Sequence, residues 1–480
     1  MQGTPLKHAA LWAIAIGLAA ACFAEQRRET FDRDPGWDGQ NNRPVAGTLR
    51  TVVQDFGYSA TDHHANGPGE VGGMITPDGL PAYYAKVIPA LSYDDSFSAS
   101  GTVVLVKGGG NTLLGFFNHD TVNEWRTPNS LVFRINGRGG ISHVHIESAT
   151  RLWRADASVI GRVDTVADRV HPIEIPSTGA HTWSIAYDPK GNDGGGSYRA
   201  TFDDVLAVCN LQPGHKADGA AFDRFGLLNV VKSVDGAGEI WIDRVVINGK
   251  PESFDADPGW EGRRNQVKYE SEEVRPRFNF GCSPTVLAGG KVPGEVGGLF
   301  FRGDCRSQNT LACYGDRLDT LALDKPLRAS GRVVLLRAVS DSTTLFGFYH
   351  AEHSMRVTDS QASALPRDFL GVSVEGPSGE GFYVYPSYRV HDGEQSSGYP
   401  DTPPRIYPNG TVHTWALEYL PGDPGKISVT LDDSRAEMPV PREHQAAGTQ
   451  FNRFGFVTPW IDGNGQRIFL DDLEYTCRQE

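Results

Sequence analysis

"FDRDPGWDG" (31–39) and "FDADPGWEG" (254–262) are the same nine-residue phrase apart from two positions, and they lie 223 residues apart in a chain of 480. Within it, "DPGW" has proline and glycine at the second and third positions of a type II turn. The turn frees Trp37 or Trp260 to pack against a core. Because both copies keep the phrase, we expect a structural role for it.

Six further pairs of segments repeat in the same order, at offsets between 223 and 232. They begin with "PGEVGG" at 68 and 293, "ASGTVVLVKG" at 99 with "ASGRVVLLRA" at 329, and "LLGFFNH" at 113 with "LFGFYHA" at 345. The others are "HTWSIAYDP" at 181 with "HTWALEYLP" at 413, "DRFGLL" at 223 with "NRFGFV" at 452, and "EIWIDRV" at 239 with "RIFLDDL" at 467. Two copies of about 220 residues indicate two domains, and we expect them at 28–250 and 251–480.

Each copy has the composition of a β domain. Short runs rich in Val, Ile and aromatic residues are bounded by Gly, Pro, Asn or Asp, and the chain has 56 glycines and 30 prolines. No window shows helical periodicity with caps. "INGRGG" (135–140) carries an Asn-Gly hairpin signal. The sequence therefore predicts an all-β protein with two tandem antiparallel β-sandwiches, produced by internal duplication.

The "HTW" strand, the "T(F/L)DD" strand and the closing "(W/F)(I/L)D(R/D)(V/L)" strand resemble the concanavalin A-like jelly roll, the group of laminin-G domains and family-16 glucanases. The longer phrase "GFFN…WRTPNSLVFRINGRGG" resembles a family of uncharacterised exported bacterial proteins. The resemblance implies a fold and a usual ligand class, glycans; it implies no reaction. Jelly rolls of this type often hold structural calcium, and hard oxygen ligands suit that ion. The candidates are Asp32, Asp34 and Asp243 in one copy, and Asp255, Asp257 and Asp471 in the other.

Residues 1–24 have the composition of an export signal, with Lys7 and His8 ahead of the apolar run from Ala9 to Ala24. We expect a secreted, periplasmic or cell-surface protein; "LAAAC" also leaves open lipid attachment at Cys22. The formal net charge of −14 and the lack of a basic run argue against nucleic-acid binding. Export permits disulfides among Cys282, Cys305, Cys313 and Cys477, in any of three pairings, and Cys209 would be a buried free thiol.

The two copies differ most in the middle. In "FRING" and "ISHVHIES", strand alternation places Phe133, Ile135, Val144 and Ile146 on one face. We expect the polar residues Arg134, His143, His145 and Glu147 on the outward face, in an open groove. Tyr383 and Tyr385 take the place of the two histidines in the second copy. Rings of this kind stack on sugars and bond to their hydroxyls. Further candidates for carbohydrate binding lie at strand ends and in loops: Asn118, Trp125, Arg126, Asn129, Trp153, Tyr349 and His350.

Three interpretations of the polar face stay open: a solvated strand, a glycan-binding surface, and a transition-metal site at His143 and His145. Our first hypothesis is an exported glycan-binding protein that uses both domains. The alternative is a polysaccharide lyase or glycoside hydrolase with its site in the first domain. The "ExDxE" signature of family-16 glucanases is absent, and a hydrolase needs two carboxylates. A lyase would need a base such as His145 near Arg134.

Overall fold

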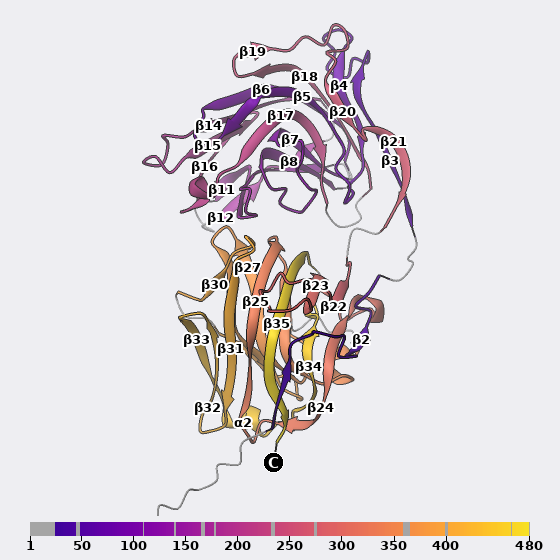
Figure 1. The fold of residues 1–480 in the computed structure, drawn as a ribbon. Helices are drawn as coiled ribbons and strands as arrows, with labels where there is room; N and C mark the ends of the chain where they lie inside the picture. Colours follow the sequence, from indigo (N-terminus) through magenta and orange to yellow (C-terminus); the bar gives the residue numbers. More distant parts are fainter. Residues whose placement is uncertain are drawn as a thin grey trace, which may run out of the picture.

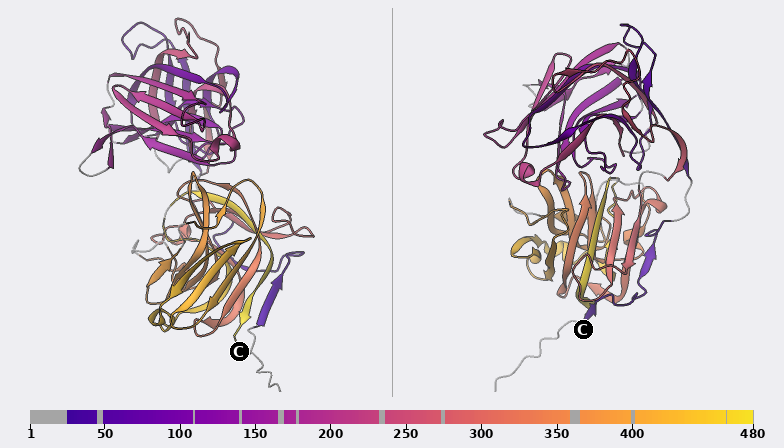
Figure 2. Two further views of the ribbon diagram at one scale, coloured as in Figure 1. Left: turned by 90° about the vertical axis from the view of Figure 1, so that its left-hand side faces the viewer. Right: turned by 45° about the horizontal axis from the view of Figure 1, so that its top comes forward.

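The computed structural model describes residues 25–44, 49–108, 110–138, 141–164, 169–176, 179–231, 236–272, 276–358, 365–398, 402–461 and 463–479. The predicted signal segment and Cys22 lie outside these ranges. As expected, the protein is almost entirely β, with two sandwiches stacked end to end (Figures 1 and 2). We call the sandwich built mainly from the first half domain 1 and the other domain 2.

Domain 1 consists of a nine-stranded and an eight-stranded antiparallel sheet. The nine-stranded sheet contains, in spatial order, β16 (Val205–Asn210), β15 (Ser197–Phe202), β14 (Ala180–Asp188), β6 (Phe97–Lys107), β18 (Gly238–Ile247), β4 (Glu70–Ile75), β3 (Arg50–Ser59) and β21 (Gln266–Ser271), with β19 (Lys250–Pro251) beside β18. The eight-stranded sheet, here called the β8 sheet, contains β10 (Ala155–Val159), β9 (Ile141–Ala149), β8 (Ser130–Arg138), β7 (Asn111–Phe117), β17 (Ala221–Asn229), β5 (Tyr83–Ser92) and β20 (Glu261–Arg263), with β13 (Ile175–Pro176) beside β9.

Domain 2 repeats the arrangement with two eight-stranded sheets. The first contains β22 (Asn279–Ser283), β23 (Glu295–Phe301), β35 (Gly465–Arg478), β25 (Leu327–Ala338), β31 (Val412–Leu420), β32 (Gly425–Leu431) and β33 (Ser434–Val440), with β1 (Glu25–Glu29) beside β35. The second, here called the β27 sheet, contains β2 (Asp38–Gln40), β24 (Cys313–Ala322), β34 (Gln450–Val457), β26 (Thr343–Tyr349), β27 (Phe369–Ser378), β28 (Gly381–Arg389) and β29 (Gln395–Ser397), with β30 (Arg405–Ile406) beside β28.

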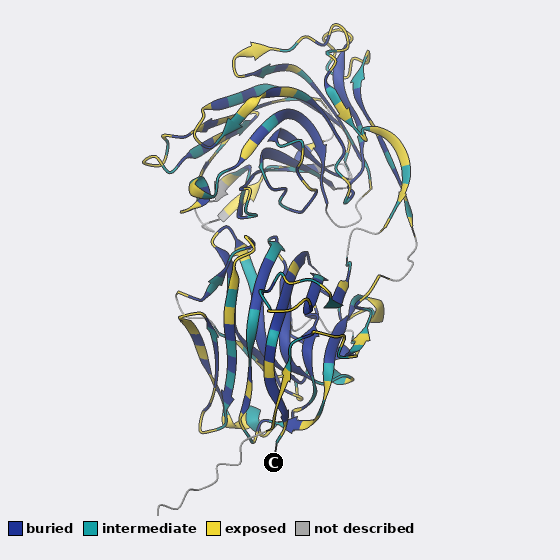
Figure 3. Ribbon diagram, viewed as in Figure 1, coloured by how far each residue is buried: buried dark blue, intermediate teal, exposed yellow. Residues whose placement is uncertain are grey.

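The remaining elements are short. A separate hairpin joins β11 (Gly161–Asp164) and β12 (Arg169–Pro172), and the helical turns are α1 (His215–Asp218), α2 (Arg442–Gln445), η1 (Gln308–Thr310) and η2 (His353–Met355). Each sandwich buries its apolar residues between its two sheets (Figure 3). Trp183 and Trp415 of the two "HTW" segments lie in these cores, as predicted.

The duplicated phrase occupies the opposite domain in each case. β1 and β2, at the N-terminal end, pair with β35 and β24 of domain 2, and Phe31 and Trp37 join the domain 2 core. Conversely, β20 and β21 pair with β5 and β3 of domain 1, and Phe254 and Trp260 join the domain 1 core. Figure 1 shows β2 against the lower sandwich and β20 and β21 in the upper one. The expected division at residue 250 therefore differs from sheet membership: residues 250–271 lie with domain 1 and residues 25–44 with domain 2.

The predicted turn forms in both copies. Gly36 and Gly259 have φ values of 70° and 63°, as the third position of a type II turn requires. The backbone N–H of each glycine donates to the aspartate two residues earlier at 2.9 Å. Trp37 then packs against Tyr314 of domain 2, with ring centroids 5.7 Å apart, and Trp260 against Tyr84 of domain 1 at 5.9 Å.

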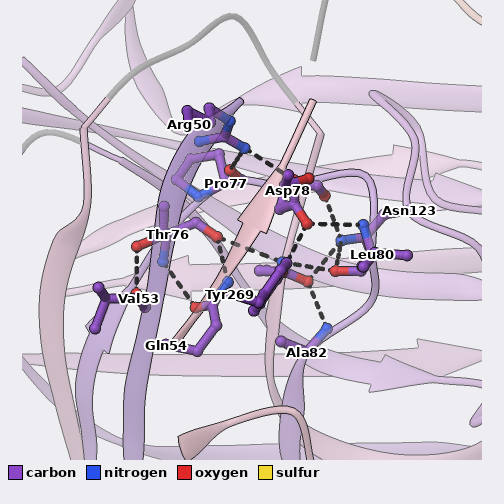
Figure 4. A network of polar contacts seen from close by, with 12 residues as sticks. Arg50, Val53, Gln54, Thr76, Pro77, Asp78, Leu80, Ala82, Asn123 and Tyr269 are labelled. Carbon is purple, nitrogen blue, oxygen red and sulfur yellow. Dashed lines mark hydrogen bonds and ion pairs between the residues drawn. The ribbon is translucent and has the colours of Figure 1, made fainter. Parts of the chain in front are cut away.

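Buried polar contacts fix the exchanged strand β21 on domain 1 (Figure 4). The buried carboxylate of Asp78 accepts hydrogen bonds from Tyr269 at 2.6 Å, from Ser271 at 2.7 Å and from Arg50 at 2.9 Å. A buried charge needs such partners to offset its lost hydration. Since Tyr269 and Ser271 come from β21, the network joins the exchanged segment to the sheet that receives it.

Two expectations of local structure are corrected. The hairpin of β8 and β9 forms, but Asn136 and Gly137 lie within β8, paired with His143 and Ser142, and so are not its turn. All five described cysteines are free thiols, including Cys209, which is buried as predicted. Cys282 and Cys477 cannot pair because β23 separates β22 from β35. Burial raises the pKa of the Cys313 thiol to about 11.

The exchange predicts where each tryptophan stabilises the protein. Trp37→Ala should destabilise domain 2, and Trp260→Ala domain 1, by about 3–5 kcal/mol each, because each change removes a buried indole. Hydrogen exchange measured by mass spectrometry should show lost protection in β24 and β34 for Trp37→Ala. The same loss should occur in β5 and β17 for Trp260→Ala. Lost protection in domain 1 for Trp37→Ala, or in domain 2 for Trp260→Ala, would contradict the exchange.

Candidate functional site

Strand alternation on β8 and β9 is as predicted. Phe133, Ile135, Val144 and Ile146 belong to the core of domain 1, and the register pairs Arg134 with His145 and Asn136 with His143. His143 and His145 are partly exposed, whereas Val144 is fully buried. The polar side chains therefore share the outer face of the β8 sheet, away from the sandwich core.

This face is not an open groove at Arg134 and Glu147, which is where the prediction was wrong. Both residues are only 3% exposed. The Glu147 carboxylate accepts from Arg134 and Arg126, and the Arg134 guanidinium lies 4.3 Å above the Trp125 ring. Burial favours the neutral form of Glu147, but the two arginines outweigh burial and hold its pKa below the ordinary value. Glu147, Arg134 and Arg126 form an internal ion-pair network, with Trp125 packed on Arg134.

A loop between β7 and β8 covers this network and is itself anchored. Asn123 donates to the backbone oxygen of Asp78 at 2.9 Å, in the network of Figure 4. Asn129 accepts from the backbone N–H of Ala221 at 3.0 Å, and Asn118 from that of Asp120 at 3.0 Å. These contacts hold the loop with Trp125 over Arg134. Asn118 and Asn129 therefore shape the loop.

Domain 2 reaches the same region of domain 1. Arg337 of β25 contacts Glu124, and its guanidinium lies 5.5 Å from the Trp153 ring. His215 Nε2 bonds to the backbone oxygen of Gly379 at 2.7 Å, across the domains. In Figure 1 the β8 sheet forms the inner arc of domain 1, above the ends of the domain 2 strands. Of the predicted ligands, Trp125 and Arg126 therefore belong to the covering loop itself, and Trp153 lies beside the second domain.

The outer face of the β27 sheet has different residues in the same register. Gly115 pairs with Val132, and Gly347 with Gly371, so Ser373 occupies the place of Arg134 and Glu375 that of Asn136. In the same way Tyr385 occupies the place of His145, Tyr383 that of His143 and Ser387 that of Glu147. The alignment of the tyrosine pair with the histidine pair is confirmed by these registers.

The substitutions open a pocket on domain 2. Ser373 and Ser387 replace the Arg134–Glu147 ion pair with a hydroxyl–hydroxyl contact of 2.8 Å. A pocket of about 250 Å³ lies over these strands. Its lining contains Thr343, Leu365, Ser373, Glu375, Tyr385, Gln395, Ser396, Ser397, Pro459 and Ile461.

Glu375 is held in place at the centre of the pocket. One carboxylate oxygen accepts from Thr343 at 3.0 Å and from Arg302, and the other accepts from the Tyr385 hydroxyl. Arg302 also donates to Thr343 at 2.8 Å. A carboxylate with several fixed donors keeps one orientation and still presents lone pairs to a ligand. Sequence reasoning missed Glu375 and Gln395 because they match no motif; the register that aligns Glu375 with Asn136 finds the position.

The other predicted residues of domain 2 lie apart from this pocket or at its rim. Tyr383 is partly exposed and donates to Glu380 at 2.6 Å. Tyr349 is buried in an apolar cluster, where burial raises the pKa of its hydroxyl well above the ordinary value. His350 stacks on His353 with ring centroids 3.9 Å apart. Tyr349 is therefore a packing residue, and His350 belongs to a separate cluster of polar side chains.

The six aspartates do not group as the repeat suggested. Asp32 and Asp34 lie in domain 2 with Asp471, and Asp255 and Asp257 lie in domain 1 with Asp243, because the N-terminal segments are exchanged. Asp243 accepts from Asn66 at 2.7 Å, and Asp34 and Asp257 cap their own turns. In the described ranges, none of the six joins two other possible ligand groups within 4.8 Å.

Asp471 differs from the other five. Its side chain is 1% exposed, and its Oδ2 atom has no hydrogen-bond partner. Burial, with the nearby charges of Asp472 and Glu295, raises its pKa to about 6. If calcium binds at one of these aspartates, Asp471 is the one whose unpaired oxygen the ion would satisfy.

Comparison with known proteins finds distant structural similarities and no match in sequence. No family model matches the sequence, and no curated protein matches it. Domains LG4-5 of the mouse laminin alpha1 chain align over 90% of this chain and 95% of theirs, with 11% identity and a TM-score of 0.26. Alginate lyase Aly36B aligns over 39% of this chain and 82% of its own, with 12% identity and a TM-score of 0.27. The Emp47p carbohydrate recognition domain covers 41% of this chain and 95% of its own, with 13% identity and a TM-score of 0.25.

These proteins share the concanavalin A-like jelly-roll architecture that the "HTW" and "DD" strands resemble. The architecture of the present chain is established by its own sheets and strand registers. Similarities this low are no evidence of a shared function. In the described part of the chain, no helix has the length and apolar character that a membrane span needs.

The ion-pair network of domain 1 predicts a large cost for removing one partner. Arg134→Ser should lower the free energy of unfolding of domain 1 by about 3 kcal/mol, because it leaves the buried charge of Glu147 with one arginine only. The double change Arg134→Ser and Glu147→Ser installs the residues that domain 2 has at these positions and should be less damaging than the single change. Urea unfolding measures both, and an unaffected single variant would contradict a structural role.

Asp471 predicts a dependence of stability on pH. Its pKa is about 6 in the folded protein against 3.8 for an ordinary aspartate, so burial of the charge destabilises the fold increasingly as pH rises from about 4 to about 6. In EGTA at pH 7, Asp471→Asn should raise the free energy of unfolding by on the order of 2 kcal/mol or less, and the melting temperature with it. Near pH 3.5 the substitution should leave both unchanged. If Asp471→Asn is less stable than the wild type in calcium buffer but not in EGTA, a calcium ion is bound at Asp471.

Proposed function

We propose that the protein binds a glycan on the outer face of the β27 sheet of domain 2. The observation that carries this proposal is the pocket around Glu375 and Tyr385, on a rigid sheet and open to solvent. Its lining combines hydroxyl, carboxylate and amide groups with an aromatic ring. Such groups bond to sugar hydroxyls, while the ring packs on the apolar face of a sugar.

The contrast between the domains favours domain 2. At corresponding positions, domain 1 has the buried Arg134–Glu147 pair beneath Trp125, and domain 2 has two serines beneath the pocket. A ligand at Arg134 would first have to displace an anchored loop. The half-buried His143 and His145 stay a prediction for a second, weaker site on domain 1.

The charge of the pocket suggests a neutral polymer. Glu375 is the one acidic residue in the described lining, and its side chain is 38% exposed. A uronic acid would bring a second carboxylate against it, at a Coulombic cost. Export, predicted from residues 1–24, would bring the protein into contact with extracellular polysaccharides.

Binding is a better match to this pocket than hydrolysis. Retaining and inverting glycosidases use two carboxylates on opposite sides of the bond. Glu375 has no such partner in the described lining, and its two oxygens already hold Tyr385, Thr343 and Arg302. The polysaccharide-degrading alternative is therefore the second hypothesis, and product formation in the binding assay would favour it.

The test begins with a glycan array on the full chain, followed by calorimetric titration of the best neutral oligosaccharide. Tyr385→Phe and Gln395→Ala should each weaken binding about tenfold, the effect of one or two lost hydrogen bonds. Glu418→Gln, on the opposite sheet of domain 2, is the control and should bind normally. If Gln395→Ala binds as tightly as the wild type, the site lies elsewhere. The same conclusion follows if binding is lost only when His143 and His145 are replaced.

A further inference from the structure

A cluster of two histidines and one aspartate lies at the edge of the β27 sheet where β27 begins and β28 ends. Nδ1 of His353 lies 2.5 Å, and Nδ1 of His391 2.9 Å, from the same oxygen, Oδ2 of Asp368. The three possible ligand atoms lie within 4.8 Å of one another. It is the one such group in the residues that the structure describes. We propose that His353, Asp368 and His391 bind a divalent transition-metal ion.

The state of Asp368 is the second, independent observation. Its side chain is 0% exposed, and its Oδ1 atom is buried without a hydrogen-bond partner. An unpaired oxygen of a buried carboxylate costs free energy that a bound cation would recover. Both imidazoles contact one carboxylate oxygen, and the other oxygen lacks a partner. This is a poor arrangement for hydrogen bonding and a suitable one for a metal ion.

Glu70 of domain 1 also lies between two histidines, and both of its carboxylate oxygens have hydrogen-bond partners. His63 bonds to its Oε1 at 2.5 Å and His64 to its Oε2 at 2.7 Å, and the backbone N–H of His63 donates to Oε1 as well. Both oxygens therefore have partners within the protein. Asp368 has the same neighbours by type but leaves one oxygen unsatisfied, and this difference points to a ligand.

The backbone at Asp368 does not require an aspartate. Asp368 has a φ of 49°, a conformation that Asn and Asp tolerate better than most residues. The registers of β7 with β8 and of β26 with β27 place Asn129 at the same position of domain 1, with a φ of 54°. Since an amide serves that backbone equally well, the charge in domain 2 needs another explanation.

The ligands are held before any metal arrives. Ser354 belongs to η2, which lies between β26 and β27 in the chain. It is fully buried, and its hydroxyl donates to the backbone oxygen of Arg367 at 2.5 Å. Trp460 donates to the backbone oxygen of Ser354 at 3.0 Å. His350 stacks on the His353 ring and accepts the backbone N–H of His353 at 3.3 Å. These contacts fix η2 against the start of β27, so binding would order few additional groups.

The donor set and its surroundings select the kind of metal. Two imidazole nitrogens and one carboxylate suit Zn²⁺ and other first-row transition ions, whereas Ca²⁺ and Mg²⁺ prefer oxygen. Arg356 and Arg367 line the same pocket of about 500 Å³ and would repel a weakly held cation. The pocket leaves room for water or an anionic group to complete a four-coordinate site.

The test is titration of the metal-free full chain with Co²⁺, followed by visible absorption and calorimetry, and competition by Zn²⁺. We expect one ion per chain, with the absorption of a site that contains imidazole. Asp368→Asn, the residue of domain 1 at this position, and His391→Ala should each lower the affinity at least tenfold. Zn²⁺ should raise the melting temperature of the wild type and not of these variants.

Matched controls separate this site from ordinary histidine binding. His413→Ala removes a histidine–aspartate pair with Nδ1 and Oδ2 2.6 Å apart but no third ligand, and His64→Ala alters the Glu70 cluster. Both should bind Co²⁺ as the wild type does. Binding that is absent in the wild type, or that is unchanged in Asp368→Asn and His391→Ala, would overturn the proposal; circular dichroism shows whether each variant is folded.

Discussion

The packing of Trp37 in domain 2 and of Trp260 in domain 1 is the contact on which the whole arrangement depends. Each indole is a buried member of the hydrophobic core of the sandwich that it joins. The turn before each tryptophan sets its direction, and the short strands after it extend a sheet of the receiving domain. Domain 2 is therefore built from two separate segments of the chain, whereas the strands of domain 1 come from one continuous segment, residues 50–271.

The buried network at Asp78 shows how the exchange also governs polar groups. It joins β21, which follows the second copy of the duplicated phrase, to the region that anchors the loop over Arg134. Through this loop the exchanged strand affects the outer face of the β8 sheet. The same exchange divides the six aspartates between domains in a different way from the repeat.

Much of the fold follows from the sequence because strand formation is a local property. Alternation around Val144 and Ile146, the turn at Gly36 and the burial of Trp183 all depend on neighbouring residues. The exchange does not, since "FDADPGWEG" both follows the first repeat and precedes the second, and either domain could accept it. Burial of Arg134 was missed for a related reason: Trp125 covers it from a loop whose path no periodicity specifies. Asp368 precedes β27 and His391 follows β28, so the register of these two strands, and no local motif, brings the two residues together.

The pairing of β1 with β35 has a consequence for synthesis. Glu25 lies opposite Arg478, so the first described strand pairs with the last described one, which is synthesised after the other strands of both sandwiches. Domain 1 has all its strands once residue 271 has emerged, whereas residues 25–40 wait until β35 has emerged. During that interval Phe31 and Trp37 are apolar side chains without their core, which a chaperone or an export channel that keeps chains extended would protect. Domain 2 thus closes after domain 1, and the segment made before domain 1 is what closes it.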